Sequence, residues 1–226
     1  MSMTYQLKEK PVTFFFLSVT ILLFIVMQVF YGSWAKSPQV VFQFGGMFGL
    51  VVKSMPSQLW RLVTPIFIHI GWEHFLINSL TLYFVGQLAE SIWGSRFFLL
   101  LYVLSGIMGN VLTLFFTPHV VAAGASTSLF GLFAAIVVVG YFGHNQLLKS
   151  IGKSYQTLII LNLVMNLFMP NVGIVGHLGG ALGGALAAVF LPTLLDAELF
   201  TKKQKTSALL SYLTLALVLI TLSLMI

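Results

Sequence analysis

The sequence of 226 residues is 58% hydrophobic and only 7% charged, and its mean hydropathy is +1.01. So few polar side chains do not cover the surface of a soluble globule, and the composition indicates an all-α polytopic membrane protein. The net charge of +6 does not indicate nucleic-acid binding, because the basic residues are scattered between apolar stretches.

Several residue types and motifs are missing, and each absence excludes a class of chemistry. The sequence has no cysteine, which excludes thiol catalysis, disulfides and thiolate metal sites. Its one aspartate, Asp196, excludes an intramembrane protease that uses a pair of aspartates. A His-Glu-x-x-His motif is also absent, so we expect neither a zinc-protease site nor any other metal or cofactor.

Charged residues mark the ends of the apolar stretches, as is usual in polytopic membrane proteins. We predict seven membrane spans, at about 12–31, 65–89, 97–116, 126–142, 155–169, 173–194 and 205–226. The stretch 32–60 is too polar to span and too apolar for a free linker, so a structured loop in the membrane interface is expected there. The expected parts are therefore a cytoplasmic tail (1–11), a six-helix core (12–195), and a linker with a seventh transmembrane helix (196–226).

The distribution of lysine and arginine predicts the orientation. With the N-terminus in the cytoplasm, the basic residues on the inner side are Lys8, Lys10, Arg96, Lys149, Lys153, Lys202, Lys203 and Lys205. Those on the outer side are Lys36, Lys53 and Arg61. We therefore expect a multi-pass protein of the cell membrane whose N-terminus is cytoplasmic.

Polar residues of three predicted spans fall at a similar depth on the outer side. Ser126 begins a helix of about 16 residues, or roughly 24 Å, which is shorter than the roughly 30 Å of bilayer hydrocarbon. His177 lies near the outer end of the span 173–194, and His69, His74 and Asn78 lie in or near the outer half of the span 65–89. Polar residues inside a membrane are candidates for function.

A serine and a histidine at one depth suggest a nucleophile and its general base. Glu73 is the one acidic residue expected on the outer side, so we predict a Ser126–His177 dyad oriented by an aromatic ring, with Phe130 as the candidate. The N–H groups at the start of the helix are candidates for stabilising an oxyanion, together with His74 and Asn78, which share one helix face. The site would open toward the extracytoplasmic side.

Glycines at every fourth position predict close helix packing beside this site. Gly176, Gly180 and Gly184 form one such row, and Gly179 and Gly183 form a second row next to it. The helix that begins at Ser126 carries Gly131 and is the expected partner. This packing would bring His177 within hydrogen-bond reach of Ser126.

Each of these features also has a purely structural explanation. A serine at a helix start is commonly an N-cap, a buried histidine is commonly structural or part of a proton relay, and a glycine row alone indicates only packing. Metal binding by His69 and His74 is disfavoured, because positions i and i+5 do not share a helix face. Arg61 and Glu90 are expected to be structural and to bond loop backbone groups.

Four local motifs stand out in this order along the chain: Trp60-Arg61, His69-x4-His74-x3-Asn78, Gly124-Ala125-Ser126 and Gly176-His177-x2-Gly180-x3-Gly184. In these motifs the chain resembles the rhomboid intramembrane serine proteases. The resemblance extends from the first to the sixth predicted span, and the seventh span resembles the six-plus-one variant of the family. It implies a rhomboid-like six-helix core with Ser126 as nucleophile, His177 as base, and His74, Asn78 and the Ser126 N–H as oxyanion donors.

The expected function is an endopeptidase that cleaves in or near membrane spans of single-span or other membrane proteins through an acyl-enzyme. We expect His69 to line water access or to be structural, and Phe130, Gly176, Gly180 and Gly184 to pack near the site. The alternative is an inactive rhomboid-like chaperone or adaptor that binds membrane clients. A proton-coupled transporter is disfavoured, because the two halves show no inverted repeat. The sequence leaves the oligomeric state open.

Overall fold

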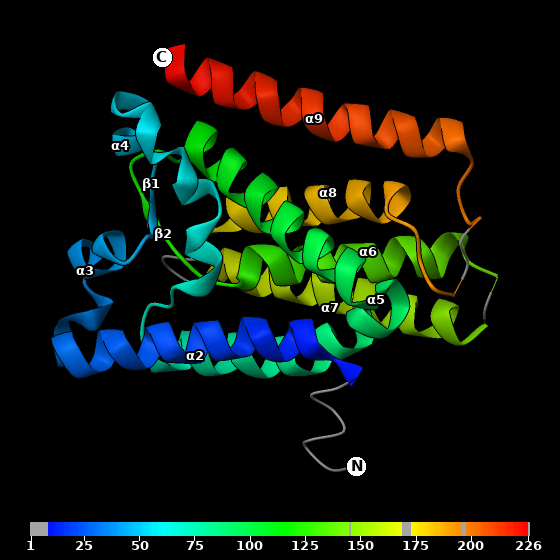
Figure 1. Ribbon diagram of the computed structural model, residues 1–226, viewed down its shortest axis with the longest axis horizontal. Helices are drawn as coiled ribbons and strands as arrows, with labels where there is room; N and C mark the ends of the chain where they lie inside the picture. The colour runs from blue at the N-terminus through cyan, green and yellow to red at the C-terminus, as the bar shows by residue number, and fades with distance from the viewer. Residues whose placement is uncertain (1–8, 145, 169–172, 196–197, 226) are drawn as a thin grey trace.

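The computed structural model describes residues 9–144, 146–168, 173–195 and 198–225, and it confirms an all-α architecture suited to a polytopic membrane protein. Figure 1 shows the first and last described long helices on opposite sides of the bundle, with the other long helices between or beside them. The first and last are α2 (Pro11–Tyr31) and α9 (Lys202–Met225), and the others are α5 (Trp72–Phe116), α6 (Ser126–Phe142), α7 (Gln146–Phe168) and α8 (Ile174–Phe190).

Among the described residues, three helical stretches are long and apolar enough to cross a membrane, namely Pro11–Lys36, Trp72–Phe116 and Lys202–Met225. Helices α6 and α8 are apolar but shorter. Within α5, Gly94 has φ 70° and ψ 159°, a conformation that separates two helices, 72–93 and 95–116. The number of membrane spans itself stays a prediction.

Several helix ends differ from the predicted span boundaries. The second span was expected to begin at Pro65, whereas residues 64–67 form a 3₁₀ helix and α5 starts only after Gly71, whose φ is +81°. Helix α7 begins at Gln146 and not at 155, since lysines do not break a helix. Helix α8 ends at Phe190 and not at 194, two residues before Pro192.

The segment between α2 and α5 is a structured loop, as predicted. Its elements are η1 (Gly32–Lys36), α3 (Pro38–Gln43), β1 (Met47–Phe48), α4 (Gly49–Ser54), η2 (Pro56–Leu62) and η3 (Thr64–Phe67). Figure 1 shows α3, α4 and β1 gathered near one end of the bundle. The end of α9 contributes Leu219 and Ile220 to a cluster with Met47 and Val52 of this loop.

Arg61 holds this loop together from inside. Its Nη1 donates hydrogen bonds to the carbonyl oxygens of Phe42 at 2.6 Å and Gly46 at 2.9 Å, and its Nε donates to Gln58 at 2.9 Å. The guanidinium also lies 3.7 Å from the ring centre of Phe42. Burial lowers the pKa of Arg61 from its ordinary value. The predicted structural role of Arg61 is confirmed by these contacts.

Glu90 joins α2 to α5 at the other end of the bundle. Its carboxylate accepts hydrogen bonds from the backbone N–H groups of Val12 at 3.1 Å and Thr13 at 2.9 Å, and from the Thr13 hydroxyl at 2.7 Å. The Ser95 hydroxyl donates to it at 2.6 Å. A carboxylate at a helix N-terminus satisfies free N–H groups and the positive end of the dipole. Glu90 therefore bonds backbone groups as predicted, but these groups belong to the first turn of α2 and not to a loop.

A two-residue sheet connects the loop to the start of α6. Strand β1 pairs antiparallel with β2 (Val121–Ala122), with Met47 opposite Ala122 and Phe48 opposite Val121. The Gly124 N–H donates to the Pro65 carbonyl at 2.9 Å. The chain that leads into α6 is therefore held between the first loop and the residues before α5.

Candidate active site

Ser126 is the first residue of α6, and the backbone just before it has a conformation that favours glycine. Gly124 has φ +139°, and a Cβ on it would lie 2.5 Å from Cε1 and 2.7 Å from Nε2 of His74. The same Cβ position is 3.5 Å from Ser126 Oγ. Gly124 therefore lets the start of α5 and the start of α6 approach each other, and it places His74 beside Ser126.

His177 lies in the first turn of α8, where its backbone N–H donates to the Gly173 carbonyl at 3.1 Å. Its imidazole Nε2 lies 2.9 Å from Ser126 Oγ, although the two residues are 51 positions apart. The imidazole is buried, and the serine is half-buried. The structure thus brings together the two side chains expected to form a dyad.

One glycine row sets the distance between α6 and α8. A Cβ on Gly180 would overlap the carbonyl oxygen of Thr127, and one on Gly184 would overlap that of Gly131. At Gly176 a Cβ would lie 3.1 Å from the Thr113 hydroxyl and 3.2 Å from Thr127 Cγ2. The expected pairing of this row with the Gly131 helix is confirmed.

The second glycine row faces a different helix. A Cβ on Gly179 would lie 2.8 Å from the Met108 carbonyl oxygen, and one on Gly183 would lie 2.5 Å from Met108 Cβ. Met108 belongs to the 95–116 part of α5. Because α8 packs backbone to backbone on two sides, its height and rotation relative to Ser126 are both constrained.

Two groups contact the His177 ring besides Ser126. The Phe130 ring stacks on it with centroids 4.2 Å apart and planes 9° apart, which is the ring contact expected from the sequence. Asn166 of α7 places Nδ2 2.8 Å from His177 Nδ1. We did not predict the Asn166 contact, although an amide in the apolar span 155–169 is a signal of the same kind that singled out Ser126.

His74 and Asn78 form the other side of the site. The Ile70 N–H approaches His74 Nδ1 at 3.5 Å, an arrangement that leaves the imidazole proton on Nε2, the atom beside Gly124. His74 therefore presents a donor toward the Ser126 side. The buried Asn78 donates one amide hydrogen to the His74 carbonyl at 2.9 Å, so it lies one turn further along the same face.

His69 precedes α5 instead of lying on it. Its Nε2 accepts a hydrogen bond from the Ala125 N–H at 3.3 Å, and its ring centroid is 5.2 Å from that of His74. A side chain that lines a water route is exposed, whereas His69 is 1% exposed. The contacts fit the structural one of the two roles expected for His69, because they hold the residue next to Ser126.

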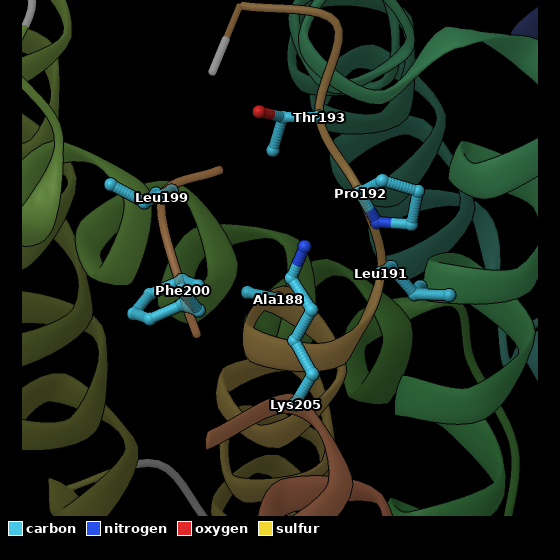
Figure 2. A pocket seen from close by; sticks show the side chains of 7 residues that line it. All are labelled: Ala188, Leu191, Pro192, Thr193, Leu199, Phe200 and Lys205. Carbon is cyan, nitrogen blue, oxygen red and sulfur yellow. The ribbon is translucent and has the colours of Figure 1, made fainter. Parts of the chain in front are cut away.

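The described residues contain no group of three or more His, Cys, Asp or Glu side chains that could hold a metal. A hollow at the far end of α8 is lined by Ala188, Leu191, Pro192, Thr193, Leu199, Phe200 and Lys205, and Figure 2 shows the Lys205 side chain within it. Ala188 is eleven residues beyond His177, or roughly 16 Å along a helix. This hollow is therefore separate from the Ser126–His177 site.

Comparison with known proteins identifies the family. The model of the Rhomboid domain matches residues 56–193. The chain is 33% identical over 208 residues to rhomboid protease GluP of Bacillus subtilis (strain 168), covering 91% of this chain and 39% of that protein. It is 30% identical over 167 residues to Rhomboid-like protease 3 of Toxoplasma gondii, covering 73% of this chain and 63% of that protein.

A relative with a different name is Inactive rhomboid protein 2 of Homo sapiens, 30% identical over 150 residues, covering 65% of this chain and 17% of that protein. The chain thus spans less than two thirds of the length of each of these three relatives. The domain match covers more than half of this chain and includes His74, Asn78, Ser126 and His177. The chain therefore belongs to the rhomboid family.

Proposed function

We propose that the protein is an intramembrane serine endopeptidase that uses Ser126 and His177 as a dyad. The observation that carries this proposal is the 2.9 Å separation of Ser126 Oγ and His177 Nε2, between residues on two different helices. A serine that only caps a helix requires no contact with an imidazole. In the described structure the N-cap position of α6 is Ala125, and no side-chain hydrogen bond caps this helix. Relatives named as proteases support the same class of activity.

The reaction follows from what these two groups can exchange. Ser126 Oγ attacks the peptide carbonyl carbon while its proton passes to His177 Nε2. His177 then gives that proton to the leaving amine, the peptide C–N bond breaks, and an acyl-enzyme remains on Ser126. A water molecule attacks the ester, with His177 again accepting and returning a proton, and the free carboxyl product leaves.

The tetrahedral intermediate carries an oxyanion that needs donors. The N–H groups in the first turn of α6 have no acceptor within the helix, and they carry the positive end of its dipole. His74 adds an Nε2–H beside Gly124. Asn78 uses one amide hydrogen on His74 and has a second that can donate.

The substrates we propose are membrane proteins cut within or close to a span. A helix hides its peptide groups in its own hydrogen bonds, so cleavage requires local unwinding. Segments with glycine or proline unwind most readily. From the lysine and arginine distribution we also propose that the protein lies in the cell membrane, with a cytoplasmic N-terminus and the site open to the outer side.

A fluorophosphonate probe tests the proposal, because it reacts with an activated serine. The detergent-purified parent should be labelled, whereas Ser126→Ala and His177→Ala should not. Ser128→Ala is the matched control, since Ser128 is a fully buried serine two positions along the same helix. It should be labelled like the parent.

The competing function is that of an inactive rhomboid-like adaptor. The similarity to Inactive rhomboid protein 2 is the observation that favours it. A folded parent that is not labelled, and that leaves a panel of single-span reporters uncut, would favour the adaptor. Labelling that persists in Ser126→Ala would also contradict the proposed nucleophile.

A further inference from the structure

Asn166 lies near the end of α7 and reaches His177 of α8. The contacts form a line through the imidazole: Asn166 Nδ2 lies 2.8 Å from Nδ1, and Ser126 Oγ lies 2.9 Å from Nε2. Each of the three side chains comes from a different helix. The two helices that carry Ser126 and His177 are fixed by glycine packing, so Asn166 is the contribution of α7 to this line.

Stacking by Phe130 does not account for the whole orientation of the ring. A parallel ring at 4.2 Å fixes the plane of the imidazole. Stacking is nearly indifferent to which ring nitrogen carries the proton, because both nitrogens lie in that plane. An in-plane polar partner is needed to choose between the two tautomers, and Asn166 is such a partner.

The position of this proton decides whether His177 can act as a base. A neutral imidazole has one N–H and one lone pair. To receive the Ser126 proton, Nε2 must present its lone pair, and the ring proton must then lie on Nδ1 and point at an acceptor. Among the described residues, no carboxylate is recorded in contact with His177, so the amide oxygen of Asn166 is the acceptor within reach.

The two ends of the amide have opposite effects. With Nδ2 facing the ring, as the structure has it, the amide donates to the Nδ1 lone pair and the ring proton lies on Nε2, where it blocks proton transfer from Ser126. Rotation of the amide by half a turn brings Oδ1 to the same place. The ring proton then lies on Nδ1, and the Oδ1 contact also stabilises the imidazolium formed during the reaction.

We propose that Asn166 is a positioning residue that selects the protonated nitrogen of His177, with its Oδ1 facing Nδ1 in the reactive state. The role in cleavage rests on the proposed function, since it requires His177 to be the base. The selection of the tautomer does not depend on cleavage, and it can be measured separately.

Two substitutions separate the amide's chemistry from its volume. Asn166→Leu keeps approximately the size of the side chain and removes both donor and acceptor. Asn166→Asp keeps the shape and leaves an acceptor-only carboxylate. Asn162→Leu is the matched control, because Asn162 lies one turn earlier on α7 and its Nδ2 donates to the Leu158 carbonyl at 2.8 Å.

The kinetic expectation is a fall in kcat with little change in KM. Loss of a hydrogen bond to an imidazolium should lower kcat on a reporter substrate roughly 10- to 100-fold in Asn166→Leu. Asn166→Asp should be faster than Asn166→Leu, because it restores the acceptor. Asn162→Leu should stay within about twofold of the parent.

The spectroscopic expectation is a change of tautomer. In protein labelled with ¹⁵N-histidine, the His177 signals are assigned by their loss in His177→Gln, and their chemical shifts report which nitrogen carries the proton. Asn166→Asp should favour the proton on Nδ1, and Asn166→Leu should give a mixture that differs from the parent. A purely structural side chain would change stability and leave the tautomer as it is.

Equal tautomer populations in the parent and both Asn166 variants would overturn the proposal, as would kcat values of Asn166→Leu and Asn162→Leu that agree within about twofold. If Asn166→Leu does not fold, the tautomer of His177 in the isosteric Asn166→Asp variant still tests the proposal. A parent that is inert to the fluorophosphonate probe would overturn the proposed function, while the tautomer measurement would still support or overturn the selection by Asn166.

Discussion

The distance between α6 and α8 should increase when a single methyl group is added at Gly180. A Cβ there overlaps the carbonyl oxygen of Thr127, and it lies 2.7 Å from its carbonyl carbon and 3.1 Å from its Cα. Non-bonded carbon atoms rest at about 3.5–4.0 Å. Because the obstacle is backbone and not the end of a flexible side chain, the two helices must separate by about 1 Å to admit the methyl group.

This separation would break the dyad contact. Ser126 Oγ and His177 Nε2 now lie 2.9 Å apart. An added displacement of about 1 Å takes them beyond hydrogen-bond range. A misplacement of that size costs about 100-fold in rate. Overpacking of this kind also destabilises a fold by about 1–3 kcal/mol, so Gly180→Ala should remain folded but slow.

The rate of fluorophosphonate labelling measures the effect, and thermal unfolding in the same detergent shows whether each variant is folded. Gly173→Ala is the matched control, because a Cβ at Gly173 meets no atom of the described residues within 4 Å. It should be labelled at the parent's rate. If folded Gly180→Ala were labelled within about twofold of the parent, the glycine row would not set the position of His177, and the reasoning above would be refuted.

Three further outcomes are expected. Gly124→Ala should abolish cleavage of a membrane reporter, because a Cβ at φ +139° is strained and collides with the His74 ring; activity near that of the parent would contradict this placement. Glu90→Gln should lower the unfolding free energy by about 1–3 kcal/mol, measured by denaturant or thermal unfolding, since the buried carboxylate accepts four hydrogen bonds; an unchanged midpoint would count against the contact. Incubation with EDTA should leave the cleavage rate unchanged, because the described residues provide no cluster of metal ligands, and a loss that added Zn²⁺ restores would show a metal requirement.

Several parts of the site could be anticipated from local patterns. The start of α6 at Ser126 follows from Gly124 and the apolar run behind it, and α6 ends at Phe142, where the span was expected to end. A ring contact between Phe130 and His177 was predicted because Glu73 is the one acidic residue expected on the outer side, and the two rings do stack. The two glycine rows indicated close packing, but not that they face two different helices.

Other parts could not be anticipated. His69 was expected in or near the span that also carries His74, whereas it precedes α5 and bonds the Ala125 backbone. Asn166 was overlooked, because whether an amide on α7 faces lipid or the ring of His177 depends on the rotation of that helix. Helix rotation is set by packing with neighbours, which one segment of sequence does not contain.

The sequence by itself determined that this is a membrane protein, where its helices approximately lie, and which residue types are available for chemistry. Hydropathy, charge and glycine spacing act along short segments, so these properties can be identified without knowing any long-range contact. Only the tertiary structure decided that Ser126 and His177, 51 residues apart, meet at 2.9 Å and that Asn166 completes the line. The reason is that such contacts depend on the relative height and rotation of separate helices. A change of about 1 Å in the distance between two side-chain atoms decides whether a hydrogen bond forms.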